Sequence, residues 1–392
     1  MGSRLADRET GVEAWPGSTR TLLTSDYLNL ALRIDPETLE PKDDGLVASG
    51  LFDSAVGLDF YGKIVKALQE IGGYKRGQPG QPATGHEAMF YTFAYDWRQD
   101  NVVTVHALDA LIEQIRRDHG DPDLRVDVIA HSMGGLVVRY YERYGTDDVL
   151  DRNSFPVTGA GARKLRRIVL LGTPNQGSVG AIHHFLNGYR VALSQLPIEG
   201  VATMPSTYQL FPHPLVPWII TTGGEPLRID LFDVAVWRRF GWSVFAHRVQ
   251  RKMVKNPDIW PSPEVFERYF EKHLERAQRF AWSLMVPVGD VELVKPLQFG
   301  GDCVPTPARL VVEEVAGEFQ ARLTPEQILK PVPGIDYDKL MYEPGDGKVA
   351  KSSLLGRQQD SDQAFFICEQ HDKLTGNVHF LDKLLRYLMS PD

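Results

Sequence analysis

The stretch VDVIAHSMGGLVVRYY, residues 126–141, determines how the rest of the chain is interpreted. Its first half is a short apolar run rich in β-branched residues, which predicts a buried strand around Val126, Val128 and Ile129. Its second half places apolar and aromatic residues three and four apart, the periodicity of one helix face, and Gly145 supplies a helix stop. Ser132 therefore stands where a strand turns sharply into a helix.

A serine at such a turn projects its hydroxyl from the edge of the sheet. The N–H groups of the following helix lie beside it and can stabilise an oxyanion. Small residues flank a nucleophile of this kind in the pattern G-x-S-x-G, and here Ala130 and Gly134 take the two small positions. The alternative is an ordinary turn in which Ser132 only caps the helix. The sequence of strand, serine, paired glycines and helix favours the nucleophile.

The composition is that of a globular chain able to bury a large core, with 392 residues of which 43% are hydrophobic. The net charge of −8 gives no electrostatic footprint for nucleic acid. Two cysteines, Cys303 and Cys368, are too few for a disulfide framework. They could pair in the folded structure, but we expect two free buried thiols. The histidines are scattered without metal-ligand spacing, so no metal or other cofactor is expected. The sequence predicts no oligomeric state.

The first residues, MGSRLADRET, lack the apolar segment of a secretory signal, and no run of 18 apolar residues occurs. By default, the chain is therefore expected in the cytoplasm.

Predicted strands and helices alternate on both sides of one segment of different character, residues 178–288. This alternation predicts an α/β fold, a mostly parallel sheet with helices on both faces. The expected division is a first core part at 1–177, a helical insertion or cap at 178–288 and a second core part at 289–392. The insertion holds five of the seven tryptophans, Trp218, Trp237, Trp242, Trp260 and Trp282. These rings either line a lipid-sized cavity or fill a small core of their own.

Strands are expected in the aromatic stretch MFYTFAYDWR (89–98), in the hairpin-like pair PARLVVEEV and GEFQARL, and in DQAFFICEQ near the end of the chain. Helices are expected at 60–71, 104–119 and 263–281.

A serine nucleophile needs a base that is itself oriented by a third group. In elbows of this kind an acid and then a histidine follow the serine along the chain. Asp346 lies in the tight loop GDGKV, and His371 lies just past the apolar strand of FFICEQHDKLTGN. We predict that His371 is the base and Asp346 its orienting carboxylate. The alternatives are an Asx turn at Asp346 and an ordinary loop histidine at His371.

Two other histidines are not expected to be the base. His131 is expected to point to the opposite side of the elbow, and His379 to lie within a helix in a structural role. The loop GDGKVAKSS also suggests a phosphate-binding loop. That pattern requires a glycine at Tyr342 and a hydroxyl residue at Val349, so the nucleotide interpretation fails.

Seven motifs in order give the chain its resemblance to the lecithin:cholesterol acyltransferase family of α/β-hydrolases. They are GSRLADRETGVEAWPG, YDWR, AHSMGG, GTPNQGS, PSTYQLFP, GDGKV and EQHDKLTGN. The resemblance implies Ser132 as nucleophile, Asp346 as the acid of the triad and His371 as base. It also implies that Asp96 and Trp97, with their neighbours in YDWR, support the site, although the ring of Trp97 also fits an ordinary core position.

Two departures from the family pattern stand out. Lys348 occupies a position after GDG where the family usually has a small or hydroxyl residue. In bacterial relatives a strand and turn precede the motif that begins this chain, and that turn gives the second oxyanion N–H. We therefore expect the first strand of the sheet to be missing, which leaves the N–H of Met133 as the oxyanion donor. Loss of one such donor costs about a hundredfold to a thousandfold in rate.

The resemblance implies acyl transfer from a lipid ester, a phospholipid or acylglycerol, to water or an alcohol through a serine ester. Transient contact with a membrane surface would bring the substrate to the site, and nucleic acid is not an expected partner. Two alternatives remain open at this point. One is a soluble carboxylesterase for small esters, and the other is a catalytically impaired relative that binds lipid or a partner.

Overall fold

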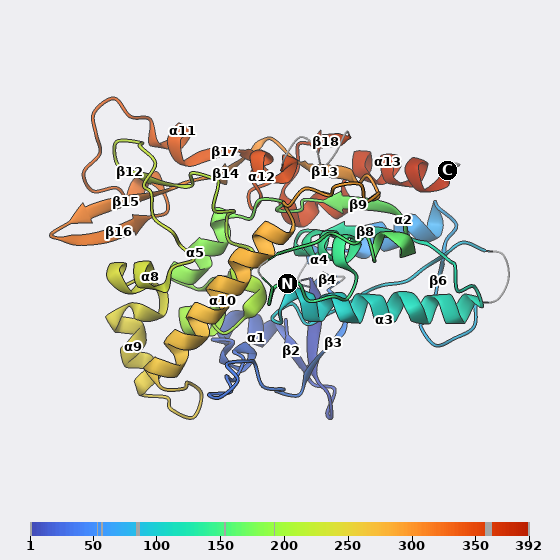
Figure 1. The fold of residues 1–392 in the computed structure, drawn as a ribbon, viewed down its shortest axis with the longest axis horizontal. Helices are drawn as coiled ribbons and strands as arrows, with labels where there is room; N and C mark the ends of the chain where they lie inside the picture. Colours follow the sequence, from blue (N-terminus) through green and yellow to red (C-terminus); the bar gives the residue numbers. More distant parts are fainter. Residues whose placement is uncertain are drawn as a thin grey trace.

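Figure 1 shows the fold in a computed structural model, which describes residues 2–52, 54–55, 58–83, 87–152, 154–191, 193–356 and 363–390. Met1, at which the opening motif was expected to be interrupted, lies outside the described residues. Within the described part of the chain, no helix is both long and apolar enough to cross a bilayer.

A parallel sheet lies at the centre of the molecule, in the strand order β18, β13, β9, β8 (Figure 1). Its strands are β8 (Val126–His131), β9 (Leu165–Leu171), β13 (Leu297–Gly301) and β18 (Ala364–Ile367). Ile129 pairs with Val169, and Phe299 pairs with Leu171 and with Phe365. Because each pairing is parallel, the carboxyl ends of all four described strands meet at one edge.

Helices cover both faces of this sheet because successive residues of a strand point to opposite sides. On one face, Ile168 and Leu170 of β9 pack in a cluster with α3 (Asn101–His119) and α4 (Met133–Tyr144). On the other face, Val169 and Leu171 pack with α2 (Gly62–Glu70) and α13 (Val378–Met389). The predicted architecture, a parallel sheet between layers of helices, is confirmed.

Residues 178–288 are mainly helical, and the long helix α10 crosses them diagonally in Figure 1. The elements of this segment are α5 (Val179–Asn187), β10 (Tyr189–Val191), β11 (Ser194–Leu196), α6 (Ile198–Val201), α7 (Pro205–Tyr208), β12 (Ile219–Thr221), α8 (Val234–Phe240), η3 (Ser243–Phe245), α9 (His247–Val254) and α10 (Pro263–Ser283). The boundaries at 178 and 288 remain a prediction, because the buried side chains of this segment form one cluster with residues near the amino terminus such as Leu5 and Tyr27.

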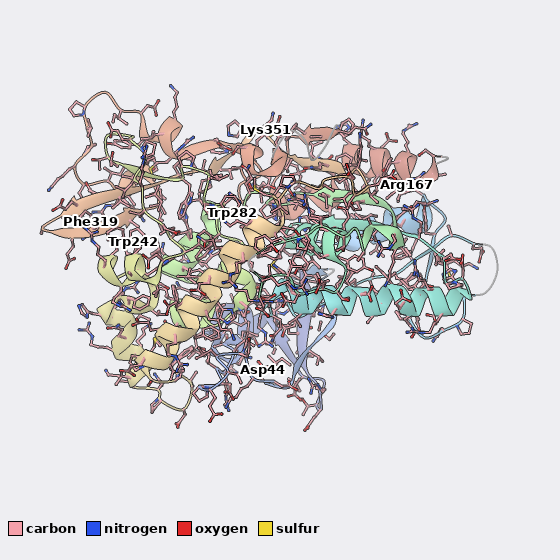
Figure 2. All side chains as sticks on the ribbon, in the orientation of Figure 1. Asp44, Arg167, Trp242, Trp282, Phe319 and Lys351 are labelled. Carbon is pink, nitrogen blue, oxygen red and sulfur yellow. A yellow bond between two sulfur atoms is a disulfide. The ribbon has the colours of Figure 1, made fainter. Side chains whose placement is uncertain are left out.

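The tryptophans of this segment fill its core. Trp218, Trp237, Trp242 and Trp260 are buried in one cluster, and Trp282 is half-buried. Trp237 stacks on Phe211 with ring centroids 5.7 Å apart. Trp242 donates its indole N–H to the carbonyl oxygen of Phe319 at 3.2 Å, and Figure 2 labels both residues. None of the five lines the large cavity described below, which favours core packing over a lipid-lining role.

Smaller sheets surround the parallel sheet and its helices. Near the amino terminus, β1 (Ser3–Asp7) pairs antiparallel with β2 (Glu13–Trp15) and β3 (Leu46–Leu51). The predicted hairpin is confirmed as β15 (Leu310–Val315) and β16 (Glu318–Arg322). The remaining elements are α1 (Thr19–Thr24), η1 (Leu28–Leu30), β4 (Ser54–Ala55), β5 (Leu58–Asp59), β6 (Lys75–Arg76), β7 (Met89–Phe90), η2 (Ala162–Lys164), β14 (Val304–Pro307), η4 (Pro325–Gln327), α11 (Tyr337–Met341), β17 (Tyr342–Gly345), α12 (Lys351–Leu355) and η5 (His371–Gly376).

The aromatic strand expected at 89–98 is shorter than predicted. Only Met89–Phe90 pair as a strand, with β6, and residues 91–96 form no regular element. Among the described residues, no strand pairs with the edge of β8 that faces away from β9.

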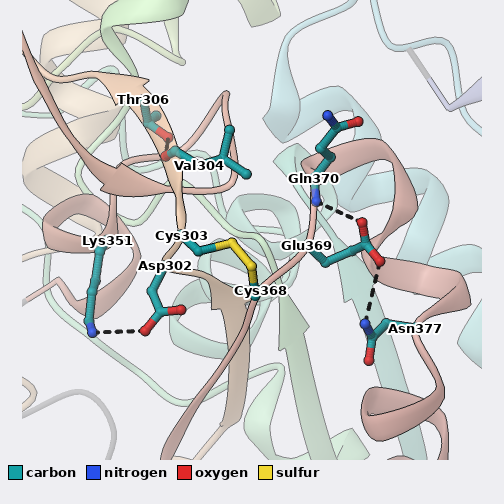
Figure 3. Close-up of a disulfide and its surroundings, with 9 residues drawn as sticks. All are labelled: Asp302, Cys303, Val304, Thr306, Lys351, Cys368, Glu369, Gln370 and Asn377. Carbon is teal, nitrogen blue, oxygen red and sulfur yellow. Dashed lines mark hydrogen bonds and ion pairs between the residues drawn. A yellow bond between two sulfur atoms is a disulfide. The ribbon is translucent and has the colours of Figure 1, made fainter.

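The two cysteines form a disulfide, with Cα atoms 5.1 Å apart, so the prediction of two free thiols is wrong (Figure 3). Cys303 and Cys368 are separated by 65 residues. They meet because β13 and β18 are parallel neighbours in register, with Gly301 opposite Ile367, and each cysteine follows its strand directly or by two residues. This pairing of distant strands could not be derived from spacing along the chain.

Candidate active site

Ser132 occupies the turn between β8 and α4 in a backbone conformation that side-chain-bearing residues rarely adopt. Its φ is 57° and its ψ is −128°. Its N–H donates to the carbonyl oxygen of Leu171 at 2.8 Å, which ties the turn to the end of β9. Strain of this kind persists only where the surroundings enforce it, and it is typical of functional sites. The predicted sharp turn at Ser132 is confirmed.

Small residues are required at this turn, but the tightest approach is at Gly135. A Cβ atom there would lie 2.0 Å from Oγ1 of Thr173, whereas a Cβ at Gly134 would find its nearest neighbour, the Tyr95 hydroxyl, at 3.8 Å. The helix therefore crosses the loop after β9 at Gly135. The pattern G-x-S-x-G predicts a small residue at Gly134 but says nothing of Gly135. The contact at Gly135 was missed because Thr173 is distant in sequence.

The three residues predicted to act together lie within hydrogen-bond distance. Nε2 of His371 is 2.9 Å from Oγ of Ser132, and Nδ1 of His371 is 2.7 Å from Oδ2 of Asp346. His371 and Asp346 are buried, and Ser132 is half-buried at the wall of a cavity. All three follow strands: Ser132 follows β8, Asp346 follows β17, and His371 comes shortly after β18.

Asp346 is held in place by the backbone of its own loop. Its Oδ1 accepts the N–H groups of Lys348 at 2.9 Å and Val349 at 2.7 Å, which leaves Oδ2 for His371. Burial alone would raise the pKa of Asp346, but His371 and these backbone donors together hold it below its usual value. The side chain is therefore an ionised acceptor facing Nδ1, which places the imidazole proton on Nδ1 and leaves Nε2 free to accept from Ser132.

Two glycines make room for this arrangement and were missed by the sequence analysis. A Cβ atom at Gly172 would lie 3.2 Å from both Oδ2 of Asp346 and Cε1 of His371. At Gly301 a Cβ atom would lie 2.7 Å from Cβ of Asp346. Their position in the sequence could have identified them, because each is the glycine at the end of a buried strand.

His131 lies against His371, so the prediction that it points to the opposite side of the elbow is wrong. The two rings have centroids 4.8 Å apart with an interplanar angle of 36°. His379 lies in α13 as predicted, and it is exposed.

Met133 is the first residue of α4, and the first N–H groups of a helix have no partner within it. Its amide therefore lies next to Ser132, in the position expected of an oxyanion donor. That role remains a prediction.

Asp96 and Trp97, predicted to support the site, contact other parts of the chain. Asp96 forms an ion pair with Arg98 at 2.8 Å, and the fully buried guanidinium of Arg98 also pairs with Asp44 at 2.5 Å. Trp97 is buried and donates its indole N–H to the carbonyl oxygen of Ser3 at 3.2 Å. These contacts anchor the amino-terminal segment, so any support for the site acts through packing.

Lys348, the unusual residue after GDG, forms an ion pair with Asp372 at 2.7 Å. Burial alone would lower the pKa of Lys348, but the surrounding groups, Asp372 among them, raise it above its usual value. The pair links the loop that contains Asp346 (the aspartate loop) to the loop that contains His371 (the histidine loop). The lysine at this unusual position therefore has an ion-pair partner.

A cavity of about 1480 Å³ opens in front of Ser132. It is lined by Ser132 and His371, by Ala181 and Leu210 from residues 178–288, and further along by apolar side chains of β8, α2 and α3. Predominantly apolar walls around a few polar groups are typical of a binding site for a hydrophobic ligand. Among the described residues, no three His, Cys, Asp or Glu side chains are arranged to hold a metal ion.

A parallel sheet between helices, with a serine at a strained strand-to-helix turn, defines the chain as an α/β-hydrolase. A chain in the crystal structure of the Tle4–Tli4 complex has a similar fold, with a TM-score of 0.62 over 99% of this chain and 96% of that one at 12% identity. The mature form of the Bacillus licheniformis lipase BlEst2 gives a TM-score of 0.33 at 13% identity over 80% and 90% of the two chains, too low to add to the argument.

The chain belongs to the lecithin:cholesterol acyltransferase family, whose sequence profile matches residues 41–301. No curated protein matches the chain. Family membership supports an acyltransferase or hydrolase that acts on a lipid ester.

Proposed function

We propose that the protein transfers an acyl group from a phospholipid or acylglycerol to water or an alcohol, through an ester formed on Ser132. The observation that carries the proposal is the chain of hydrogen bonds from Ser132 through His371 to Asp346, at 2.9 and 2.7 Å. An alternative cap role for Ser132 has no support, because its side chain makes no capping hydrogen bond to α4.

In the first half-reaction, Oγ of Ser132 attacks the ester carbonyl carbon while its proton passes to Nε2 of His371. Negative charge develops on the carbonyl oxygen and is stabilised by the N–H of Met133. The carbonyl–oxygen bond to the leaving alcohol then breaks, and this alcohol takes the proton from His371. Asp346 keeps the imidazole in the correct tautomer and stabilises its protonated form.

In the second half-reaction, water or another alcohol gives its proton to His371 and attacks the acyl carbon. Ser132 leaves with that proton, so the protein returns to its starting state. The product is a free fatty acid when water attacks and a new ester when an alcohol attacks. Access of the two acceptors to the cavity decides between hydrolysis and transfer.

The walls of the cavity favour a lipid over a small ester. They are predominantly apolar around a few polar groups, Ser132 and His371 among them, as in binding sites for hydrophobic ligands. We therefore expect long acyl chains to be accepted, delivered by transient contact with a membrane surface.

The test is labelling with a fluorophosphonate, followed by peptide mass spectrometry. We expect label on Ser132 in the wild type and none in Ser132→Ala or His371→Ala. His379→Ala is the matched control, because this histidine is exposed on α13 and should leave labelling unchanged. Label that persists in Ser132→Ala would contradict the mechanism.

The substrate is tested with phosphatidylcholine and diacylglycerol vesicles. Release of fatty acid is expected from the wild type and not from Ser132→Ala, and an added long-chain alcohol should appear as its ester if transfer occurs. A preference for acetyl esters over long-chain esters would select the carboxylesterase alternative.

A further inference from the structure

We propose that His131, held by the hydroxyl of Tyr61, is a positioning residue for His371. This inference rests on the proposed function, because it assigns His131 a role in the same reaction. Nε2 of His131 is 3.2 Å from the carbonyl oxygen of His371, and Nδ1 of His131 is 3.1 Å from the hydroxyl of Tyr61. A second hydrogen-bonded chain therefore ends on the backbone of the residue that moves the proton.

The partners of His131 fix its tautomer. A carbonyl oxygen can only accept, so Nε2 of His131 must carry a proton in order to bond to His371. In the neutral ring Nδ1 then has no proton, and it accepts the hydroxyl proton of Tyr61. Of the two neutral tautomers, only this one satisfies both ring nitrogens.

The charge state agrees with this geometry. Burial, and then the neighbouring His371, lower the pKa of His131 to about 3, against the opposing effects of Asp372 and Asp346. Burial, with the charge of Asp372, raises the pKa of Tyr61, so its hydroxyl keeps its proton. His131 is therefore a neutral donor at neutral pH.

The backbone of His371 is held at both of its polar groups. Its N–H donates to the carbonyl oxygen of Asp346 at 2.8 Å, and its carbonyl oxygen accepts from His131. The ring of His131, tilted by 36° against that of His371 with centroids 4.8 Å apart, restricts the same residue from the side. Because a displacement of about 1 Å can cost about a hundredfold in rate, a contact that fixes this backbone acts on catalysis without touching the substrate.

Tyr61 connects the pair His131 and His371 to the start of α2. It directly precedes the helix, and the carbonyl oxygen of its neighbour Phe60 accepts the hydroxyl of Thr375 in η5. The beginning of α2 thus contacts the histidine loop directly through Phe60 and indirectly through Tyr61 and His131. Neither contact was predictable from sequence, because residues 60, 131 and 371 are far apart along the chain.

The first experiment compares three variants with wild type in the hydrolysis of a chromogenic fatty acyl ester. We expect His131→Leu to lower kcat by about 10- to 100-fold with KM changed less than about twofold. His131→Gln, which keeps an N–H donor near the position of Nε2, should recover most of the rate. Tyr61→Phe should lower kcat by about three- to tenfold, the effect of one lost hydrogen bond.

Two control variants separate positioning from a general loss of packing. His273→Leu removes a buried histidine, and Tyr337→Phe removes a tyrosine hydroxyl that bonds to the carbonyl oxygen of Thr222. Both residues lie outside the cavity wall. These variants should lower the melting temperature with kcat unchanged. If His131→Leu keeps the wild-type kcat, or if His131→Gln is no better than His131→Leu, the inference is overturned.

A second measurement does not depend on activity. The ¹⁵N spectrum of histidine-labelled protein should show His131 as the neutral tautomer with its proton on Nε2 between pH 5 and 8 (range set by the ordinary histidine pKa of about 6.5). A proton on Nδ1, or a doubly protonated ring, would overturn the inference. Failure of the proposed function is recognised separately, as a wild-type Ser132 that does not react with fluorophosphonate.

Discussion

At Asp346 the two carboxylate oxygens have different tasks, and this division makes Asp346→Asn informative. Oδ1 accepts two backbone N–H groups, so the amide oxygen of asparagine must take that position. The amide nitrogen then faces Nδ1 of His371 and donates to it, which moves the imidazole proton to Nε2. Nε2 can no longer accept from Ser132, and we expect kcat to fall by about three to four orders of magnitude with little change in KM.

Asp372→Asn is the control for that substitution. Asp372 directly follows His371 in the chain and pairs with Lys348 at a partly exposed position. Loss of its charge should therefore change kcat by less than about threefold. Steady-state kinetics on both variants test the argument. Equal losses in the two would mean that local charge, and not the tautomer of His371, controls the rate.

The crossing of α4 over the loop after β9 is tested at Gly135. A Cβ atom 2.0 Å from Oγ1 of Thr173 forces the helix or the loop to move, and we expect Gly135→Ala to destabilise the fold by about 1–3 kcal/mol. Gly134→Ala has ordinary contact distances in the same helix turn and should be tolerated. Thermal unfolding of the two variants measures the difference, and equal melting temperatures would contradict the crossing.

Among single residues, the sequence predicted those whose role follows from chain order. Ser132 and His371 follow β8 and β18, and the parallel sheet brings the ends of these strands to one edge, so their meeting was foreseeable. Asp346 follows β17, which pairs antiparallel with β14 outside that sheet, so its place was predicted from the order of the three residues along the chain alone. His131 and Tyr61 were not, because their role depends on which side of the elbow the histidine loop passes. That path is set by packing of α2 and η5, which leaves no pattern in the sequence.

At the scale of elements, the disulfide joins the segments that carry Asp346 and His371. Cys368 lies shortly before His371, and Val304, next to Cys303, forms a bridge with Asp346. Closing a loop of 65 residues is worth about 4 kcal/mol in the chain-entropy account. We expect the double variant Cys303→Ser, Cys368→Ser to lose up to this free energy of unfolding in urea denaturation and to label Ser132 more slowly.

Wild-type protein that has been reduced and alkylated serves as a second sample for that comparison. It should approach the double variant in stability. An unfolding free energy equal to that of the untreated protein would show that the link contributes nothing to the fold.

The elements with strong periodicity were predicted close to their observed limits, as for α10 and the hairpin β15–β16. The segment 89–98 was overestimated as a strand because its apolar and aromatic composition satisfies the pattern, whereas strand formation also needs a neighbour to pair with. The disulfide was missed for a related reason. Both depend on which segments become neighbours in the sheet.

At the scale of the whole molecule, histidines that the fold keeps neutral tie stability to pH. Burial lowers the pKa to about 3 at His131 and His273 and to about 4 at His183 and His184. Unfolded histidine titrates near about 6.5, so between about pH 6.5 and 4 the unfolded state binds more protons. Stability is therefore complete above about pH 6.5 and decreases as the pH falls, by about 1.4 kcal/mol per pH unit for each proton taken up.

Urea denaturation at a series of pH values from 7.5 to 5 measures this slope (the window follows from the unfolded histidine pKa of about 6.5). His273→Leu should reduce the slope by about one proton, because this ring takes up a proton only on unfolding. A slope that is the same in the variant would show that His273 is already protonated in the folded state.

One edge of β8 has no strand neighbour among the described residues. That edge faces the cavity, between apolar side chains of α2 and α3. Backbone N–H and C=O groups on an unpaired edge are a template for another extended chain, and apolar walls on both sides add to the attraction. A further strand, from another segment or another molecule, would therefore be added to the sheet directly beside Ser132.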